Sequence, residues 1–196
     1  TFRSGHPNGP TNLRRSIIKS SNVYYYMLAN DMGVDMIHDY MKPLGFGQIT
    51  GIDVRGEARG VLPSTEWKRN TYKRPEQKKW YAGETISLGI GQGYNNFTIL
   101  QLANAMSTLA AKGVKHRPHL AVGRVDAVTQ QFSAINKDPG TSMGYKPENV
   151  EAVRAAVAAV TVEGTSRGIF GNAPYTSTGK TGTAQAVGVR QNEKYN

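Results

Sequence analysis

Residues 179–185 read Gly-Lys-Thr-Gly-Thr-Ala-Gln, a run of small residues around a single lysine. Threonine favours an extended backbone, and glycine lets another backbone lie close beside it. In such a segment the Lys180 cation is placed to hold a carboxylate while the neighbouring backbone pairs with a peptide. The run therefore indicates a peptide-binding edge, although Lys-Thr-Gly by itself is not specific.

A second polar segment, Ser20-Ser21-Asn22, separates two apolar runs early in the chain. A hydroxyl and a carboxamide two positions apart can point the same way from a loop, which suits proton transfer and the binding of an amide group. The same residue types also serve as helix caps. Taken alone, the segment fits both interpretations.

Apolar residues recur at helical spacing in several stretches, which we predict as helices. They are 13–18 with Asn12 as cap, a run from 23 that ends at Gly33, 36–41, 99–110 ending near Gly113, and a helix opened by Pro147. We predict a strand within 119–128 and a buried glycine-rich segment over 85–94, and loops over 45–63 and 129–146. Because the chain has 22 glycines and nine prolines, it is expected to have a mixed architecture, not that of a helical bundle.

The charge of the chain narrows the class of protein. Its formal net charge is +10, which favours an acidic partner such as a nucleic acid, an anionic membrane surface or an anionic polymer. The densest basic run, 68–79, is broken by Pro75 and Glu76 and is interpreted as a solvated loop. Ribonucleoprotein, zinc-finger and leucine-heptad signatures are missing, so we expect no nucleic-acid partner.

Other residue patterns exclude several kinds of site. Cysteine is absent, which excludes disulfides, thiolate zinc sites and a cysteine nucleophile. His116 and His119 lie near each other without a carboxylate close in sequence, and we interpret them as surface residues. The run Gly89-x-Gly91-x-Gly93 lacks the spacing of a dinucleotide site and the Lys-Ser/Thr of a phosphate loop. We interpret it as backbone packed tightly under a helix.

The order of the two polar segments, Ser-x-Asn and then Lys-Thr-Gly far downstream, resembles that of the penicillin-recognising serine acyltransferases. Within that group the chain resembles the transpeptidase domain of class B penicillin-binding proteins of the elongation, or rod-shape, type. The stretches that carry the resemblance further are 31–35 (Asp-Met-Gly-Val-Asp), 50–53 (Thr-Gly-Ile-Asp), 62–68 (Leu-Pro-Ser-Thr-Glu-Trp-Lys), 80–85 (Trp-Tyr-Ala-Gly-Glu-Thr), 89–94 (Gly-Ile-Gly-Gln-Gly-Tyr), 164–165 (Gly-Thr), 173–175 (Ala-Pro-Tyr) and 179–185. It extends from about residue 13 to the last residue and is weakest over 124–146.

The resemblance implies a fold. The expected class is α/β, an α+β sandwich of the penicillin-binding protein and serine β-lactamase type, in which helices surround an antiparallel sheet. We expect residues 1–196 to be the central part of the transpeptidase domain, incomplete at both ends. The upstream Ser-x-x-Lys helix, the last strands and the closing helix would then lie outside this chain. The resemblance implies no cofactor and no metal.

The implied activity is peptidoglycan D,D-transpeptidation. This is serine acyl transfer on D-alanyl-D-alanine stem peptides that cross-links the cell wall during rod elongation, and β-lactams trap the same serine. By the resemblance, Ser20 relays protons to the leaving amine, Asn22 contacts the substrate amide and the active-site lysine, and Lys180 supplies positive potential. The Thr181 and Thr183 hydroxyls would bind the terminal carboxylate, and the Thr183 N–H would form half of the oxyanion hole. The full set of implied substrate-binding residues is Ser21, Thr181, Gly182, Thr183 and Ala184.

The nucleophile is expected to lie elsewhere. The Ser-x-x-Lys that precedes the Ser-x-Asn segment is Ser16-Ile17-Ile18-Lys19. On a helix its Ser16 and Lys19 would share a face, but Lys19 abuts Ser20, so the two motifs could not face each other across a cleft. We therefore expect Ser16 not to be the nucleophile, and this chain alone to be inactive.

The resemblance also implies partners and a location. The partners are peptidoglycan stem peptides, β-lactam antibiotics bound covalently at the absent serine, and elongation-complex membrane proteins such as the rod-type glycosyltransferase. The location is the periplasmic face of the bacterial inner membrane, with an N-terminal anchor absent from this chain. Alternatives of the same fold are a β-lactamase or D,D-carboxypeptidase and a non-catalytic β-lactam-sensing homologue. A nucleic-acid binder, the alternative from another class, predicts DNA affinity that falls steeply with salt.

Overall fold

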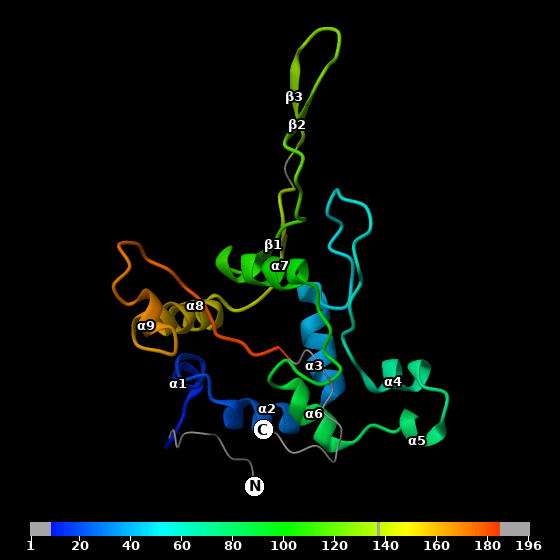
Figure 1. Ribbon diagram of the computed structural model, residues 1–196, viewed down its shortest axis with the longest axis vertical. Helices are drawn as coiled ribbons and strands as arrows, with labels where there is room; N and C mark the ends of the chain where they lie inside the picture. The colour runs from blue at the N-terminus through cyan, green and yellow to red at the C-terminus, as the bar shows by residue number, and fades with distance from the viewer. Residues whose placement is uncertain (1–8, 137, 185–196) are drawn as a thin grey trace. The chain divides into compact units, whose positions relative to one another are not determined.

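The computed structural model describes residues 9–136 and 138–184 (Figure 1). Its helices are α1 Leu13–Ile18, α2 Asn22–Met32, α3 Val34–Met41, the 3₁₀ turn η1 Lys42–Leu44, α4 Thr65–Thr71, α5 Pro75–Lys78, α6 Ala82–Leu88, α7 Ile99–Ala110, α8 Pro147–Val162 and α9 Arg167–Phe170. Its strands are β1 Val114–Lys115, β2 Gly123–Val125, β3 Phe132–Ala134 and β4 Thr141–Ser142. Within the described ranges, no helix combines the length and apolar character needed to cross a bilayer.

The chain divides into two compact units, each assembled from segments that are far apart in sequence. The first unit comprises Thr1–Gly33, Trp80–Asn95 and Ala156–Asn196, and the second comprises Val34–Lys79 and Asn96–Ala155. Helix α8 begins in the second unit and ends in the first. Both polar segments singled out from the sequence therefore belong to the first unit.

The core of the first unit is formed by apolar side chains of α1, α2, α6 and α8. Its buried members are Ile17, Ile18, Ala29, Leu88, Ala156, Val157 and Val160. Helices α2 and α6 lie side by side (Figure 1). Gly89, just after α6, approaches α2 so closely that a Cβ would fall 2.5 Å from the Tyr25 carbonyl oxygen. At Gly89 the interpretation of the glycine run as backbone packed tightly against a helix is confirmed.

Helix α6 itself is not predicted by the sequence pattern, which assigns no helix to 85–94. Its start is held by the Glu84 carboxylate, which accepts the Tyr81 N–H and the Tyr94 hydroxyl, each at 2.9 Å. The first of these bonds satisfies a backbone N–H at the beginning of the helix. The helix is short and contains Gly83, so its seven residues show no apolar stripe that a periodicity search would detect.

Helix α7 organises the second unit. Thr98 and Gln101 form a capping box, in which Thr98 Oγ1 accepts the Gln101 N–H at 3.1 Å and Gln101 Oε1 accepts the Thr98 N–H at 3.2 Å. Gln101 is fully buried, and its Nε2 donates to the carbonyls of Gln48 at 2.5 Å and Arg59 at 2.8 Å. The predicted helix 99–110 is confirmed, and it fixes the predicted loop 45–63 through a polar side chain.

The buried face of α7 differs from the expected one. Its buried residues are Gln101, Asn104 and Thr108, while the apolar Leu102 and Met106 are about half exposed, at 48% and 45%. Positions 101, 104 and 108 share one helix face, opposite the apolar stripe. The apolar periodicity therefore predicts the helix correctly, but this unit buries the polar side that binds the 45–63 loop.

The sheet structure of the described residues consists of two short antiparallel ladders. Strand β1 pairs with β4 and strand β2 pairs with β3, with Val125 opposite Phe132. Strand β2 confirms the strand predicted within 119–128. The loop predicted over 129–146 is wrong in part, because β3 and β4 lie there.

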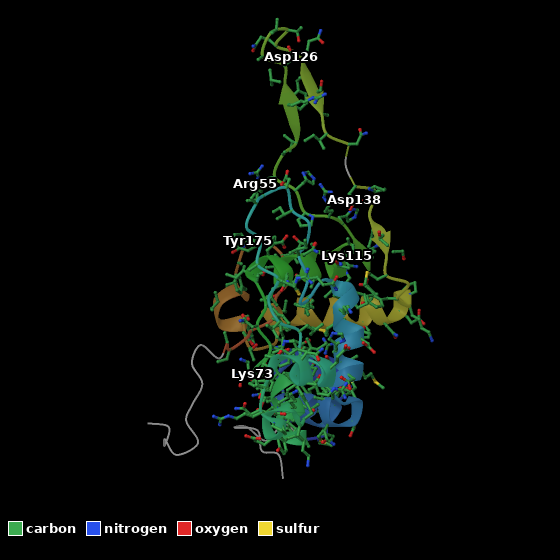
Figure 2. The ribbon with its side chains drawn as sticks, turned by 90° about the vertical axis from the view of Figure 1, so that its right-hand side faces the viewer. Arg55, Lys73, Lys115, Asp126, Asp138 and Tyr175 are labelled. Atoms are coloured by element: carbon green, nitrogen blue, oxygen red, sulfur yellow. The ribbon has the colours of Figure 1, made fainter. Side chains whose placement is uncertain are left out.

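A polar turn at the tip of the β2–β3 hairpin explains this difference (Figure 2). The Asp126 carboxylate accepts N–H bonds from Val128 at 3.0 Å and Thr129 at 2.8 Å, and these bonds hold the pKa of Asp126 below its usual value. Gln130 has φ 56°, a left-handed conformation that helps to reverse the chain. The residues that resemble a loop in the sequence therefore build the turn of a hairpin.

Candidate active site

Ser20 stands at the junction of α1 and α2 in a backbone conformation that is unusual for serine. Helix α1 ends in the two bonds of a Schellman motif: the Ser20 N–H donates to the Ile17 carbonyl at 3.2 Å and the Ser21 N–H donates to the Ser16 carbonyl at 2.9 Å. The left-handed position of this motif is usually glycine, and here it is Ser20, with φ 52°. Because such strain clusters at functional sites, the backbone alone makes Ser20 a candidate functional residue.

The two residues after Ser20 differ in exposure. Ser21 is the N-cap residue of α2 and is only 5% exposed. Asn22 is the first residue of α2 and is exposed. A ligand therefore has access to Asn22, whereas Ser21 is largely covered by protein.

Lys180 joins the two polar segments. Its Nζ donates to Ser20 Oγ at 2.6 Å and to the Thr181 carbonyl at 2.9 Å, and it lies 3.5 Å from Thr181 Oγ1. An ammonium group has three protons, and these three contacts account for them. Partial burial lowers the pKa of Lys180, because desolvation disfavours the charged form. Side chains 160 positions apart in the chain thus form one polar cluster.

The end of α8 holds the segment that carries Lys180. Thr161 is 4% exposed and donates its hydroxyl to the Ser177 carbonyl at 2.7 Å. The Gly179 N–H donates to the Val157 carbonyl at 3.3 Å. The sequence predicts an extended segment here; 177–184 forms no strand, and its backbone is bound to α8.

The turn after α8 reaches the same cluster. The Thr165 N–H donates to the Ile18 carbonyl at 3.3 Å, and Thr165 Oγ1 lies 3.1 Å from Thr181 Oγ1. Gly164 packs directly on α1, since a Cβ there would fall 2.6 Å from the Ile18 carbonyl oxygen. The sequence singles out 164–165 only as part of the family resemblance, and no pattern along the chain shows that Thr165 meets Thr181.

Beyond Thr181 the segment is open to solvent. Gly182, Thr183 and Ala184 are exposed, and a Cβ at Gly182 would meet nothing within 4 Å. Gln92, in the loop after α6, donates from Nε2 to the Thr183 carbonyl at 3.3 Å. Gln92 and Thr165 are the contacts of this site that sequence reasoning missed, because each depends on packing between distant segments.

Ser16 is arranged as a structural residue. It is fully buried, and its hydroxyl donates to the Leu13 carbonyl at 2.7 Å and lies 3.2 Å from the Tyr25 hydroxyl. Burial raises the pKa of Tyr25. The Lys19 Nζ instead donates to the Glu163 carbonyl at 3.3 Å. A ligand in solvent has no access to the Ser16 oxygen, and Lys19 does not bond to it.

The cluster has a definite chemical capacity. It presents a hydroxyl on Ser20, a cation of lowered pKa on Lys180 and a hydroxyl on Thr181, with the exposed Thr183 two residues further along the chain. An ammonium bonded to a hydroxyl can pass a proton through it, and a cation beside exposed hydroxyls can bind a carboxylate. This combination suits proton transfer to a substrate that is anchored by an anionic end.

The comparison with protein families agrees with this geometry. The profile of the penicillin-binding protein transpeptidase domain matches residues 2–196. The chain belongs to this family. The fold class expected from the sequence is thereby confirmed.

Individual members of the penicillin-binding protein family support the finer resemblance. Peptidoglycan D,D-transpeptidase MrdA of Haemophilus influenzae is 39% identical over 199 residues, covering 99% of this chain and 29% of the relative. MrdA of Acinetobacter baumannii is 39% identical over 196 residues, covering 99% of this chain and 28% of the relative. The chain therefore spans less than a third of the length of these relatives.

Solved structures of penicillin-binding proteins match as well. Pseudomonas aeruginosa PBP2, solved in complex with WCK 5153, superposes with a TM-score of 0.75 at 39% identity, over 90% of this chain and 39% of that one. A chain from a study of how a peptidoglycan synthase complex coordinates polymerization and crosslinking superposes with a TM-score of 0.70 at 34% identity, over 90% of this chain and 28% of that one. The resemblance to the elongation-type transpeptidases, penicillin-binding protein 2, is confirmed.

Proposed function

We propose that this chain carries two of the three catalytic segments of a peptidoglycan D,D-transpeptidase that cross-links the cell wall during rod elongation. The observation that supports this most directly is the 2.6 Å hydrogen bond from Lys180 Nζ to Ser20 Oγ. It joins the Ser-x-Asn segment to the Lys-Thr-Gly segment at one site. The names of the MrdA relatives assign D,D-transpeptidation to those proteins.

The reaction is serine acyl transfer. A serine oxygen attacks the carbonyl carbon of the D-alanyl-D-alanine peptide bond, the C–N bond breaks, and the terminal D-alanine leaves as an amine that receives a proton. An amine of a neighbouring stem peptide then attacks the acyl-enzyme and releases the serine, which recovers its proton. If water resolves the acyl-enzyme instead, the same site acts as a D,D-carboxypeptidase.

Each residue of the cluster has a proposed part in this reaction. Ser20 relays the proton to the leaving amine, and the hydrogen bond that it accepts from Lys180 supports this role. Asn22, exposed at the start of α2, contacts the substrate amide and the active-site lysine. The Thr181 and Thr183 hydroxyls bind the terminal carboxylate, and the Thr183 N–H completes the oxyanion hole.

The remaining proposed substrate-binding residues are two in the exposed segment and Ser21 at the start of α2. Gly182 and Ala184 lie where the segment is exposed, so a stem peptide can run beside them. Ser21 is proposed as a substrate-binding residue on the family resemblance alone, since only 5% of it is exposed and its N–H is bonded to the Ser16 carbonyl.

The nucleophile is proposed to lie outside this chain. Ser16 has its hydroxyl bonded inside α1. A second Ser-x-x-Lys, Ser177 to Lys180, lies in a segment without helical structure, and its lysine is bonded to Ser20. Lys19, at the end of α1, bonds to the Glu163 carbonyl and not to Ser16, so neither pair supports activation of the serine by its lysine.

The proposal extends to partners and location. β-Lactams would bind covalently at the absent serine, and peptidoglycan stem peptides would be the substrate. This chain is similar to one from a peptidoglycan synthase complex that coordinates polymerization and crosslinking. That similarity supports the proposal of an elongation-complex glycosyltransferase as a membrane partner. The protein would work at the periplasmic face of the inner membrane, held by an anchor outside this chain.

A fluorescent penicillin tests the proposal. We expect the 196-residue chain not to be labelled, and the full-length protein to be labelled at a serine outside these residues, located by mass spectrometry of the labelled peptide. The Ser16→Ala variant of the full-length protein should be labelled like the wild type. Labelling of Ser16 in the short chain would overturn the assignment of the nucleophile. A full-length protein without labelling, and without cross-linking of stem peptides, would overturn the proposed function.

A further inference from the structure

Thr165 belongs to a ring of hydrogen bonds, called here the circuit, around the polar cluster. Its N–H donates to the carbonyl of Ile18, two residues before Ser20. Its hydroxyl lies 3.1 Å from that of Thr181, and Lys180 in turn donates to Ser20 at 2.6 Å. The circuit therefore starts and ends at the junction of α1 and α2.

The turn that carries Thr165 is held rigidly. Gly164 packs against backbone atoms, because its Cβ would fall 2.6 Å from the Ile18 carbonyl oxygen and 2.8 Å from Val160 Cα. Glu163, one residue earlier, forms an ion pair with Arg14 and accepts a bond from Lys19 through its carbonyl at 3.3 Å. A rigid backbone on this side lets the hydroxyl of Thr165 act as a fixed partner for Thr181.

The protons available to Thr181 limit how its hydroxyl can be used. A hydroxyl has one proton and two acceptor lone pairs. The Lys180 ammonium, which can only donate, faces Thr181 Oγ1 at 3.5 Å. If Thr165 also donates to that oxygen, both lone pairs are directed inward and the Thr181 proton points to the remaining, exposed side.

We propose that Thr165 is a positioning residue that donates its hydroxyl proton to Thr181 and thereby directs the Thr181 proton toward the carboxylate of the substrate. This rests on the proposed function, in which Thr181 binds the terminal carboxylate of a stem peptide or of a β-lactam. Thr165 itself does not touch the substrate. If the Thr165 hydroxyl is removed, the Thr181 proton can rotate toward solvent, and the substrate carboxylate loses an aligned donor.

The experiment uses the full-length protein and three variants. Thr165→Val removes the hydroxyl but keeps the shape, and Thr165→Ser keeps the hydroxyl. Thr176→Val is the matched control, since Thr176 is an exposed threonine on the approach to Lys180. Acylation by benzylpenicillin and by its methyl ester is followed at increasing ligand concentration, which separates the half-saturation concentration from the limiting rate.

We expect Thr165→Val to raise the half-saturation concentration for the carboxylate form about tenfold, the size of one charge-assisted hydrogen bond of about 1.4 kcal/mol. The limiting rate should change less than threefold, and the ester should be affected little, because it has no anionic carboxylate to align. Thr165→Ser should stay within about twofold of the wild type. Loss of fold alone would impair the carboxylate and the ester equally.

The outcomes separate this inference from the proposed function. The role of Thr165 alone is overturned if the wild type is acylated but Thr165→Val behaves like Thr176→Val. It is also overturned if Thr165→Val raises the half-saturation concentration equally for benzylpenicillin and its methyl ester. A wild type that benzylpenicillin does not acylate overturns the proposed function, and with it the role of Thr165. If Thr165→Val weakens binding of benzylpenicillin but not of its ester, and Thr165→Ser binds like the wild type, the result supports both the role of Thr165 and the proposed function.

Discussion

Ser20 occupies a position where the backbone and the chemistry make opposite demands. The Schellman motif at the end of α1 places this residue at φ 52°, where glycine is the least strained choice. The hydrogen bond from Lys180 requires a hydroxyl at the same place. Serine meets the second demand at a cost to the first, which is typical of functional sites.

Two substitutions at Ser20 separate these demands. Ser20→Gly and Ser20→Ala both remove the hydroxyl, so the difference between them reports the backbone alone. We expect Ser20→Gly to be more stable than Ser20→Ala by about 1 kcal/mol, because only alanine is strained at positive φ. Urea unfolding measures both.

The control for this pair is Asn30, an exposed residue within α2. There the order should reverse, with alanine more stable than glycine by about 1 kcal/mol, since the backbone is helical. Equal stabilities of the two Ser20 variants would show that Ser20 is not held in a left-handed conformation.

Lys180 predicts a specific dependence of stability on pH. Partial desolvation of the Lys180 ammonium lowers its pKa in the folded state below the usual value near 10.5, so the unfolded state binds more protons between the two pKa values. The stability of the wild type should therefore rise with pH in that window, relative to Lys180→Met and Lys180→Arg. Neither methionine nor arginine titrates there. Denaturant titrations from pH 8 to 11 measure the difference, and a difference that stays flat against both variants would contradict the lowered pKa.

At this scale the sequence identifies residue types better than their contacts. Ser20, Asn22 and Lys180 stand out because their order along the chain resembles a known family. Thr165 and Gln92 lie in stretches that carry the resemblance, but their contacts with Thr181 and Thr183 are not visible in the sequence, because each depends on a distant segment. The left-handed φ of Ser20 is also hidden, since glycine, and not serine, is the usual signal for such a turn.

At the scale of elements, the turn between α8 and α9 positions the cluster through a glycine. A Cβ at Gly164 would collide with backbone atoms of Ile18 and Val160 that no side-chain rotation can move. Gly164→Ala should therefore reduce the free energy of unfolding by about 1–3 kcal/mol, the usual cost of overpacking. The midpoint of urea unfolding measures this.

Gly168, in α9, provides the matched control. A Cβ there would meet nothing within 4 Å, and the residue lies within a helix. Gly168→Ala should leave stability unchanged or raise it by about 0.4–1 kcal/mol. If Gly164→Ala proved as stable as Gly168→Ala, the close packing of the α8–α9 turn on α1 would be refuted.

The elements that the sequence predicts are those with a long repeating pattern or a clear boundary. Helix α7 has an apolar stripe and α8 opens with Pro147, and both are confirmed. Helix α6 is short and depends on a carboxylate that binds two partners, so periodicity does not reveal it. The β2–β3 hairpin is formed by a polar turn around Asp126, which in sequence resembles any loop.

At the scale of the whole molecule, the first unit shows why the order of the two polar segments along the chain predicts the site better than any local sequence pattern. It gathers three segments that are far apart in sequence, and Ser20 bonds to Lys180 although all of α8 lies between them along the chain. No local rule predicts such a meeting, because it depends on closing a long loop. The resemblance to a family, which covers nearly the whole chain, predicts it by assigning both segments to one site.

The net charge of the whole molecule predicts binding to anionic lipid surfaces. A net charge of +10 creates a field that acts at long range at low salt, so the chain should bind vesicles that contain anionic lipid. The screening length falls from about 30 Å at 0.01 M salt to about 8 Å at 0.15 M, and binding should be lost over that range. Co-sedimentation with vesicles measures it, and neutral vesicles are the control.

Two triple variants decide whether the total charge or one basic run is responsible. Lys73, Arg74 and Lys78 are exposed in the dense basic segment, whereas Arg55, Arg124 and Lys146 are exposed at dispersed sites (Figure 2 marks Arg55 and Lys73). Changing either set to glutamine removes three of the ten net charges. The interpretation of 68–79 as a loop is wrong in its structure, because α4 and α5 occupy most of it and Lys68 is buried. If the exposed charges of this segment are only solvated, both variants should weaken vesicle binding equally. A much larger loss from the 73/74/78 variant would instead make that segment a dedicated binding site for an anionic partner.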